Sequence, residues 1–133
     1  MSHAFPIRVY YEDTDLAGIV YYANYLKFIE RGRSEWVRAL GVDQVAMKRE
    51  FGLVFAVRRV EADYLRPAKF DDELIVTTDL VAETGARIVL EQAVMRGAEK
   101  LFAATVTLVC LTETGAAARL PAEVRRKLAP PLH

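Results

Sequence analysis

The sequence predicts an α+β fold in which one long helix lies against a curled antiparallel sheet of about five strands. A helical period of apolar residues runs through residues 24–40, and four long segments rich in Val, Ile, Leu, Thr and Phe follow it. The connections between these segments are short, which favours antiparallel pairing because parallel neighbours need a crossover of about a dozen residues or more. The chain has 133 residues, of which 53% are hydrophobic, so we expect a single domain over residues 1–133.

The first strand is predicted from about Phe5 to Tyr11, where Ile7 and Val9 alternate with arginine and tyrosine. A polar loop follows over residues 12–18 and is closed by Gly18. This loop leads toward the long helix, so its side chains are expected near the N-terminal end of that helix.

The long helix is predicted from Asn24 to Leu40, with Asn24 as its N-cap and Gly41 at the C′ position. One face of it is apolar, and that stripe consists of Tyr25, Phe28, Ile29, Gly32, Trp36, Val37 and Leu40. A glycine within a helix costs about 0.5–1 kcal/mol relative to alanine. We therefore expect Gly32 to let the helix approach the sheet closely.

A shorter helix is predicted over Asp43–Phe51 and ended by Gly52. Four strands and a last short helix are expected after it, at Leu53–Tyr64, Glu73–Val81, Arg87–Met95, Leu101–Leu111 and Pro121–Leu128. One long helix covers only one face of such a sheet. The uncovered face and the open edge strand therefore favour a homodimer.

The composition excludes several classes of protein. The 18 Lys and Arg residues balance 18 Asp and Glu residues, so nothing supports nucleic-acid binding by bulk charge. Cys110 is the only cysteine, which rules out an intrachain disulfide and a cysteine-based metal cluster, and we expect a buried, inert thiol. The chain shows no apolar signal segment and no run of the roughly 18 apolar residues that a membrane span needs. We expect a cytoplasmic protein.

Histidine is scarce and lies only near the ends of the chain. The two histidines are His3 and His133. Nucleophile systems built on Ser–His–Asp or Cys–His need a positioned imidazole, so they are not expected here. If the protein is an enzyme, a carboxylate must carry out the proton transfer or the nucleophilic attack.

The densest acidic group is Glu12, Asp13 and Asp15 in the loop after the first strand. A calcium loop starting at Asp13 is rejected, because Ala17 occupies its fifth position and Asn24 stands where a bidentate Glu belongs. A phosphotransfer Asp-x-Asp motif would call for a doubly wound α/β domain, which this pattern does not show. A solvated loop that caps a turn stays open as an alternative.

An apolar, aromatic segment over residues 16–22 joins the acidic loop to the helix, so a carboxylate and the helix N-terminus could face one pocket. Free backbone N–H groups in a first helical turn stabilise negative charge that develops on a carbonyl oxygen. A nearby carboxylate can attack the carbonyl carbon or activate water. This pair of groups suits carbonyl chemistry.

Residues 10–25 read YYEDTDLAGIVYYANY and are followed by Phe28, Glu30 and Arg33. This run resembles the signature of the hotdog-fold acyl-CoA thioesterases. It is most similar to the 4-hydroxybenzoyl-CoA thioesterase family and its Tol-Pal-associated YbgC branch, and the similarity continues at residues 63–64, 71–74 and 102–106. The resemblance implies a sheet wrapped around one long helix and continued across a dimer. It also implies hydrolysis of a small or medium acyl-CoA thioester to free acid and CoA.

Position by position, the resemblance makes Asp15 the catalytic carboxylate, as nucleophile or as general base toward water, and Asp13 a structural residue. The backbone N–H that polarises the thioester carbonyl falls on Tyr22, and Gly18 permits the turn between the two catalytic groups. The YbgC branch usually has histidine at the position of Tyr22, whereas the hydroxybenzoyl-CoA branch has tyrosine. Because the implied role uses the main chain, tyrosine is compatible with it.

The acyl pocket has three aromatic candidates. Tyr21, Tyr25 and Phe28 could line it, although core packing explains Tyr25 and Phe28 equally well. Trp36 is expected in the core or at a subunit interface.

Charged residues on the predicted strands could contact the rest of the substrate. Arg58, Arg59 and Arg87 are candidates for binding the phosphates of coenzyme A, because a planar guanidinium suits phosphate. Ordinary solvated strand positions are the alternative for each of them. Glu61 and Asp63 could reach the active site of a partner subunit in a dimer.

The partners implied are an acyl-CoA substrate, a second copy of the chain in a dimer or homotetramer, and an acyl carrier protein. Coenzyme A enters only as part of the substrate, and no metal or other cofactor is expected. The rival function is a hotdog protein that binds acyl-CoA or an acyl carrier protein without hydrolysis. A hydratase of the same fold is disfavoured, because such sites resemble histidine-containing dyads.

Overall fold

The computed structural model describes residues 2–128, and the elements below are those of this range. The strands are β1 His3–Arg8, β2 Leu53–Tyr64, β3 Glu73–Glu83, β4 Arg87–Arg96, β5 Glu99–Thr112 and β6 Ala117–Ala118. The helices are α1 Asn24–Ala39, α2 Gln44–Phe51 and α3 Ala122–Leu128, with a short 3-10 turn, η1, at Tyr11–Asp13.

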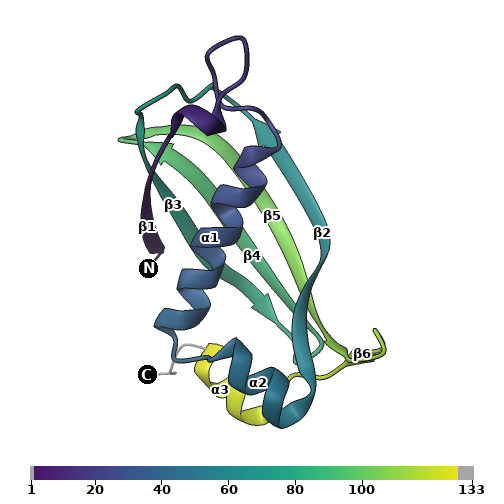
Figure 1. Cartoon of the computed structure of the whole chain (residues 1–133). Helices are drawn as coiled ribbons and strands as arrows, with labels where there is room; N and C mark the ends of the chain where they lie inside the picture. The colour runs from purple at the N-terminus through teal and green to yellow at the C-terminus, as the bar shows by residue number, and fades with distance from the viewer. Residues whose placement is uncertain (1, 129–133) are drawn as a thin grey trace.

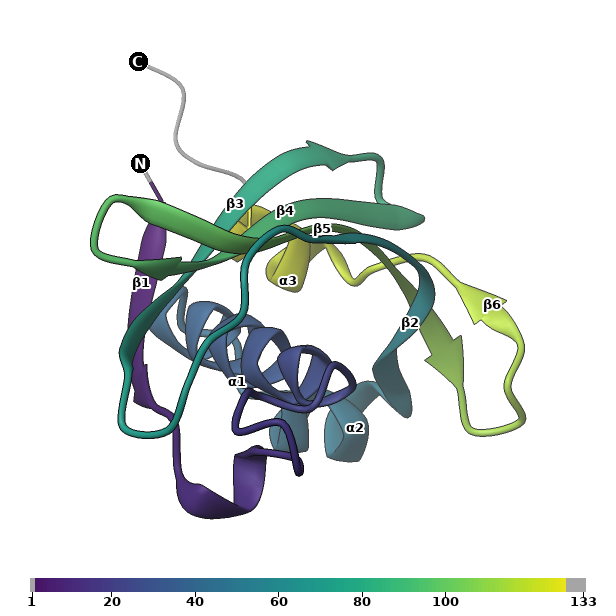
Figure 2. The same ribbon diagram turned by 90° about the horizontal axis from the view of Figure 1, so that it is seen from above.

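The strands form one sheet in the order β1-β3-β4-β5-β2, and every neighbouring pair is antiparallel. The sheet curves around α1, and α2 and α3 lie toward the C-terminal end of that helix (Figures 1 and 2). The predicted α+β fold is confirmed. The sequence did not indicate β6, a strand of two residues that pairs with the end of β5.

Helix α1 buries the predicted stripe against the inner face of the sheet. Its buried residues are Tyr25, Phe28, Ile29, Gly32, Trp36 and Val37. A Cβ atom placed on Gly32 would lie 2.9 Å from the Cβ of Val76 on β3. Carbon atoms in contact are normally about 3.5–4 Å apart, so only glycine allows this approach. The close contact predicted between helix and sheet is confirmed.

A buried amide also joins α1 to the sheet. Gln92 on β4 is 2% exposed, and its Nε2 donates to the carbonyl of Ile29 and to Thr78 Oγ1, each at 2.9 Å. Its Oε1 accepts from Arg33 Nη1 at 2.9 Å. Burial lowers the pKa of the Arg33 guanidinium. The bonds to Ile29 and Arg33 fasten the middle of α1 to β4, and the bond to Thr78 joins β4 to β3.

Several predicted helix and strand ends shift in the structure, most of them by one or two residues. The first strand ends at Arg8, not at Tyr11, because the chain turns into η1, where Asp13 Oδ2 accepts from the Tyr10 N–H at 2.8 Å. Asn24 is not the N-cap of α1 but its first residue, and Ala23 occupies the cap. The strand predicted to begin at Leu101 begins at Glu99.

The histidines do not approach the acidic loop. His3 is the first residue of β1, at the opposite end of that strand from the loop, and His133 lies outside the described residues. Cys110 on β5 is 1% exposed, and burial raises the pKa of its thiol, which confirms the expected buried cysteine.

Strand β2 forms one edge of the sheet. A bulge interrupts its register between Val57 and Arg59. Val57, Val60 and Tyr64 are all exposed, so apolar side chains accompany the open edge. These features suit contact with a second subunit, and the homodimer stays a prediction.

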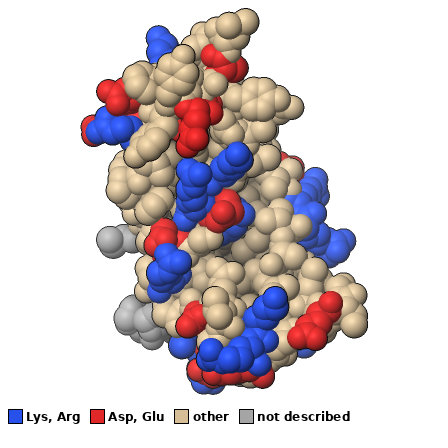
Figure 3. Space-filling view, in the orientation of Figure 1, with Lys and Arg blue, Asp and Glu red and all other residues tan. Residues whose placement is uncertain are grey.

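Acidic and basic side chains are interspersed on the face of the molecule that Figure 3 shows. Among the described residues, no helix has both the length and the apolar character needed to cross a membrane.

The close contact at Gly32 gives a stability prediction. Gly32→Ala forces a methyl group against Val76, so we expect the free energy of unfolding to fall by about 1–3 kcal/mol, as for other overpacked cores. Urea unfolding measures this. The control is Arg31→Ala on the exposed side of α1, for which we expect a change within about 0.5 kcal/mol. Equal stability of Gly32→Ala and the wild type would contradict the packing argument.

Candidate active site

The acidic loop folds into a small hairpin over residues 14–20. Thr14 and Val20 form an isolated antiparallel bridge, and the Asp15 N–H donates to the carbonyl of Ile19 at 2.9 Å. The Gly18 N–H donates back to the Asp15 carbonyl at 2.9 Å, and Gly18 has a φ of 78°. This left-handed conformation favours glycine. Gly18 therefore permits the turn, as predicted, and Asp15 lies near the start of the hairpin.

The Asp15 side chain is exposed. Its Oδ1 accepts a hydrogen bond from the Ala17 N–H at 2.9 Å, which holds the carboxylate against its own turn. Within the described part of the chain, no Lys or Arg forms a salt bridge with Asp15, and Oδ2 has no hydrogen-bond partner. One carboxylate oxygen is thus fixed and the other is available.

Asp13 joins the hairpin to the start of α1. Its Oδ2 accepts from the Tyr10 N–H, and its carbonyl accepts from the Tyr21 N–H and from Asn24 Nδ2, both at 2.9 Å. These contacts agree with the structural role expected for Asp13. Asn24 is already the first residue of the helix, and its side chain donates to the hairpin.

Tyr22 precedes Ala23, the N-cap of α1, and so lies at the positive end of a 16-residue helix. Within residues 2–128, the backbone N–H groups of Tyr22 and Ala23 make no hydrogen bond. Figure 1 shows the hairpin projecting beyond this end of the helix. Two free donors and one exposed carboxylate therefore lie in the same short segment of the chain.

Aromatic rings surround this end of the helix. Tyr22 contacts Tyr21, with ring centroids 5.0 Å apart, and meets the ring of Tyr64 edge-on at 5.9 Å. All three side chains are exposed. Tyr64 ends β2, far along the chain from the motif, so only the strand pairing could have placed it here. Partial desolvation by the neighbouring rings, and to a lesser degree the nearby Tyr22 hydroxyl, raise the pKa of Tyr64.

Two of the aromatic candidates for the acyl pocket belong to the core. Tyr25 is 3% exposed and stacks on Phe102 at 5.1 Å, and Phe28 is 1% exposed. The core-packing alternative describes both residues, and Tyr21 is the exposed member of the three. Trp36 is also a core residue.

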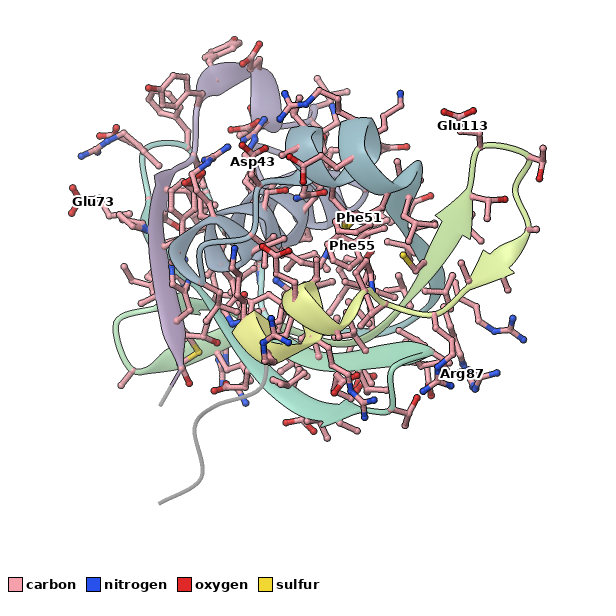
Figure 4. All side chains as sticks on the ribbon, turned by 90° about the horizontal axis from the view of Figure 1, so that it is seen from below. Asp43, Phe51, Phe55, Glu73, Arg87 and Glu113 are labelled. Carbon is pink, nitrogen blue, oxygen red and sulfur yellow. The ribbon has the colours of Figure 1, made fainter. Side chains whose placement is uncertain are left out.

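The predicted phosphate-binding arginines separate into two groups. Arg58 and Arg87 line one cavity of about 320 Å³ together with Arg119, which the sequence analysis did not single out. Figure 4 shows Arg87 pointing outward at the end of the sheet that carries β6. Arg59 lies outside this cavity and pairs with Glu61 at 3.3 Å. Arg58 and Tyr64 are six positions apart on β2, which corresponds to about 20 Å along a strand.

Glu61 and Asp63 line a groove together with Asp79 and Glu91. Their reach into a partner's site stays a prediction. No cluster of three or more His, Cys, Asp or Glu residues suited to a metal ion occurs in the described part of the chain.

Comparison with known proteins now identifies the family. A family model described as the thioesterase-like superfamily matches residues 9–128. The chain belongs to the thioesterase-like superfamily. The resemblance found at residues 10–25 is thereby confirmed.

Relatives within this superfamily cover most of the chain. The acyl-CoA thioesterase YbgC of Haemophilus influenzae is 45% identical over 108 residues, which are 81% of this chain and 79% of the relative. The crystal structure of a probable thioesterase from Bartonella henselae is 39% identical, with a TM-score of 0.86 over 91% of this chain and 100% of the other.

A more distant structure shows the same hotdog fold. It is a 4-hydroxybenzoyl-CoA thioesterase mutant complexed with 4-hydroxybenzoyl-CoA, 21% identical, with a TM-score of 0.88 over 96% of this chain and 99% of the other.

In this member of the superfamily, the hairpin rests on the turn before β3. The Val20 N–H donates to the carbonyl of Ala68 at 2.9 Å, and Ile19 forms an isolated antiparallel bridge with Lys69. Asp72 closes the turn, because its Oδ2 accepts from the Lys69 N–H at 2.8 Å and from Arg96 Nη1 at 2.7 Å. Partial burial acts to raise the pKa of the Asp72 carboxyl, but these hydrogen bonds lower it overall.

The depressed pKa of Asp72 gives a pH-dependent prediction. A carboxyl whose pKa is lower in the folded chain adds stability above its unfolded pKa, near 3.8, and loses it as the pH falls through the folded pKa. We expect Asp72→Asn to lower the free energy of unfolding by about 1–2 kcal/mol at neutral pH. This difference from the wild type should shrink below about pH 4. Urea unfolding from about pH 7 to about pH 3 measures it.

The matched control is Asp71→Asn, the same chemical change at the neighbouring residue. Asp71 pairs with Arg8 at the surface, where ion pairs contribute about 0–1 kcal/mol. A loss for Asp72→Asn that stays constant down to the lowest pH would show that the ionised carboxylate is not the stabilising group.

Proposed function

We propose that this chain, an acyl-CoA thioester hydrolase by its family and relatives, uses Asp15 as its catalytic carboxylate and the Tyr22 N–H as its oxyanion donor. The observation that carries the proposal is the free N–H of Tyr22 at the positive end of α1, in the segment that also presents the exposed Asp15. A helix N-terminus stabilises negative charge without rearrangement, because its donors are already in place.

The reaction needs only these two groups and water. The thioester carbonyl oxygen accepts a hydrogen bond from the Tyr22 N–H, which polarises the carbonyl carbon. In one route, Asp15 attacks this carbon, the C–S bond breaks, CoA leaves as its thiolate, and water then hydrolyses the acyl–Asp15 anhydride. In the other route, Asp15 takes a proton from water as the resulting hydroxide attacks the carbon. The C–S bond of the tetrahedral intermediate then breaks, and the departing CoA thiolate takes the proton back from Asp15. Both routes yield the free acid and CoA.

The acyl group would lie against the exposed rings beside the donor. Tyr21, Tyr22 and Tyr64 provide an aromatic wall there. The small or medium acyl group that the family resemblance implies would pack against this wall. Binding of an acyl carrier protein, the other partner implied by the family, stays a prediction.

The cavity formed by Arg58, Arg87 and Arg119 is the site we propose for the phosphates of CoA. These arginines have no salt bridge within the described residues, so their donors are available to phosphate. In a homodimer joined by antiparallel pairing of the two β2 edges, the Arg58 end of one β2 would approach the Tyr64 end of the other. One subunit would then hold the phosphates while the other holds the thioester.

We propose a homodimer or a dimer of dimers as the working form, and the cytoplasm as its compartment. The open edge and exposed apolar residues of β2 support the dimer. A single free thiol is compatible with a reducing compartment.

The role of Asp15 is tested by Asp15→Asn, which keeps the shape of the side chain and removes its charge. We expect kcat for a panel of acyl-CoA thioesters to fall by at least about 100-fold. Steady-state hydrolysis measures this. The control is Glu12→Gln, the same change at an exposed residue of the preceding turn, which should leave the rate unchanged.

Two results would contradict this assignment differently. Unchanged hydrolysis by Asp15→Asn would remove Asp15 from the mechanism while leaving the enzyme a thioesterase. Absence of hydrolysis by the wild-type protein, together with measurable binding of acyl-CoA, would favour a binding protein instead.

The phosphate site is tested by Arg87→Ala. The loss of one exposed charge contact of about 1 kcal/mol should raise KM for acyl-CoA about fivefold and leave kcat unchanged. The same variant should hydrolyse an acyl-pantetheine thioester, which lacks the nucleotide phosphates, as well as the wild type does. Arg49→Ala on α2 is the control for general loss of positive charge. Equal effects of Arg87→Ala on both substrates would contradict the phosphate role.

A further inference from the structure

We propose that the hydroxyl of Tyr25 is a positioning group that holds the Asp15 hairpin at a fixed place relative to the N-terminus of α1. The inference rests on the proposed function, because it concerns the distance between the Asp15 carboxylate and the Tyr22 N–H. It gives the buried ring of Tyr25 a role beyond core packing.

A continuous path of hydrogen bonds leads from the helix to the hairpin. Tyr25 Oη, in the first turn of α1, accepts from the Ala68 N–H at 3.0 Å. The carbonyl of Ala68 accepts from the Val20 N–H at 2.9 Å, and the next residue, Lys69, pairs with Ile19. The N–H of Ala68 thus bonds to α1, and its carbonyl bonds to the hairpin that carries Asp15.

Both ends of the Tyr25–Ala68 bond are held firmly. Ala68 is fully buried, so its N–H has no route to solvent. The Tyr25 ring stacks on Phe102 with an angle of 11° between the ring planes, and meets Phe28 and Tyr64 edge-on. The ring cannot move without disturbing three others, so the position of its hydroxyl is set by the core.

The Tyr25–Ala68 bond would fix the distance between the two proposed catalytic groups, the Asp15 carboxylate and the Tyr22 N–H. The oxyanion donor lies at the start of α1. Asp15 belongs to a hairpin that is joined to α1 at its base, through the Asp13 carbonyl, and that rests with its second strand on the turn before β3. Without the hydroxyl of Tyr25, that turn is bound to β4 through Arg96 but loses its bond to α1. A misplacement of about 1 Å can cost on the order of 100-fold in rate. Tyr25 thus acts through Asp15 and does not touch the substrate.

The test is Tyr25→Phe, which removes one oxygen and keeps the ring. We expect kcat for acyl-CoA hydrolysis to fall by about tenfold or more, with KM within about twofold of the wild type. We also expect faster hydrogen exchange at the Val20 amide and in residues 66–72. The exchange rate reports how firmly the hairpin is bound to the turn, even if Asp15 has no part in the chemistry.

The matched control is Thr78→Val. It removes the hydroxyl that accepts from Gln92 Nε2, at a residue 1% exposed, and has no bond to the hairpin or to the turn that supports it. It should lower stability to a similar degree without slowing hydrolysis or changing exchange at Val20. If Thr78→Val reduces kcat as much as Tyr25→Phe does, general destabilisation explains the loss, and the positioning role is overturned.

A double variant separates this inference from the proposed function. In Asp15→Asn, adding Tyr25→Phe should cause no further loss of the residual rate, because both changes act on one group. Unchanged exchange at Val20 in Tyr25→Phe overturns the positioning role whatever the activity. Full activity of Asp15→Asn overturns the proposed role of Asp15 instead. If exchange at Val20 is still faster in Tyr25→Phe, the positioning of the hairpin by Tyr25 stands even though Asp15 is not catalytic.

Discussion

The packing of α1 into the curved sheet is the constraint on which the rest of the structure depends. Gly32 lets the helix touch Val76 on β3, and Gln92 on β4 bonds to the helix through the Ile29 carbonyl and Arg33. An unpaired buried amide costs about 1–3 kcal/mol, so the Gln92 bonds favour one depth and one rotation of the helix. The N-terminal end of α1 consequently has one place relative to β1 and to the turn before β3.

The proposed site uses main-chain groups that this placement positions. The carbonyl of Asp13 accepts from Tyr21 and Asn24, so the acidic hairpin begins where the helix begins. The oxyanion donor is a peptide N–H, which any side chain at Tyr22 would leave in place. Only the carboxylate of Asp15 has to come from a side chain. Because the oxyanion donor is main chain and the carboxylate is the one side chain required, the proposed site needs no imidazole.

The elements with a strong period could be predicted from the sequence, and those fixed by side-chain contacts could not. The apolar stripe of α1 predicted its buried face, including the contact at Gly32. Two of the shifted boundaries lie where polar side chains bond to neighbouring backbone. Asp13 accepts from Tyr10 and turns the chain after β1, and Asn24 bonds to the hairpin and not to its own helix.

The candidate site was only partly visible for the same kind of reason. The motif named Asp15, Gly18 and the Tyr22 amide because they are close in sequence. Tyr64 and Arg119 come from distant segments, and strand pairing alone brings them to the places that they occupy.

The buried environment of Cys110 has a practical consequence: thioester hydrolysis releases the thiol of CoA, and this enzyme contributes no reactive thiol of its own. A thiol-reactive dye can therefore follow turnover directly, and a cysteine introduced on the surface can be labelled without first replacing the natural one.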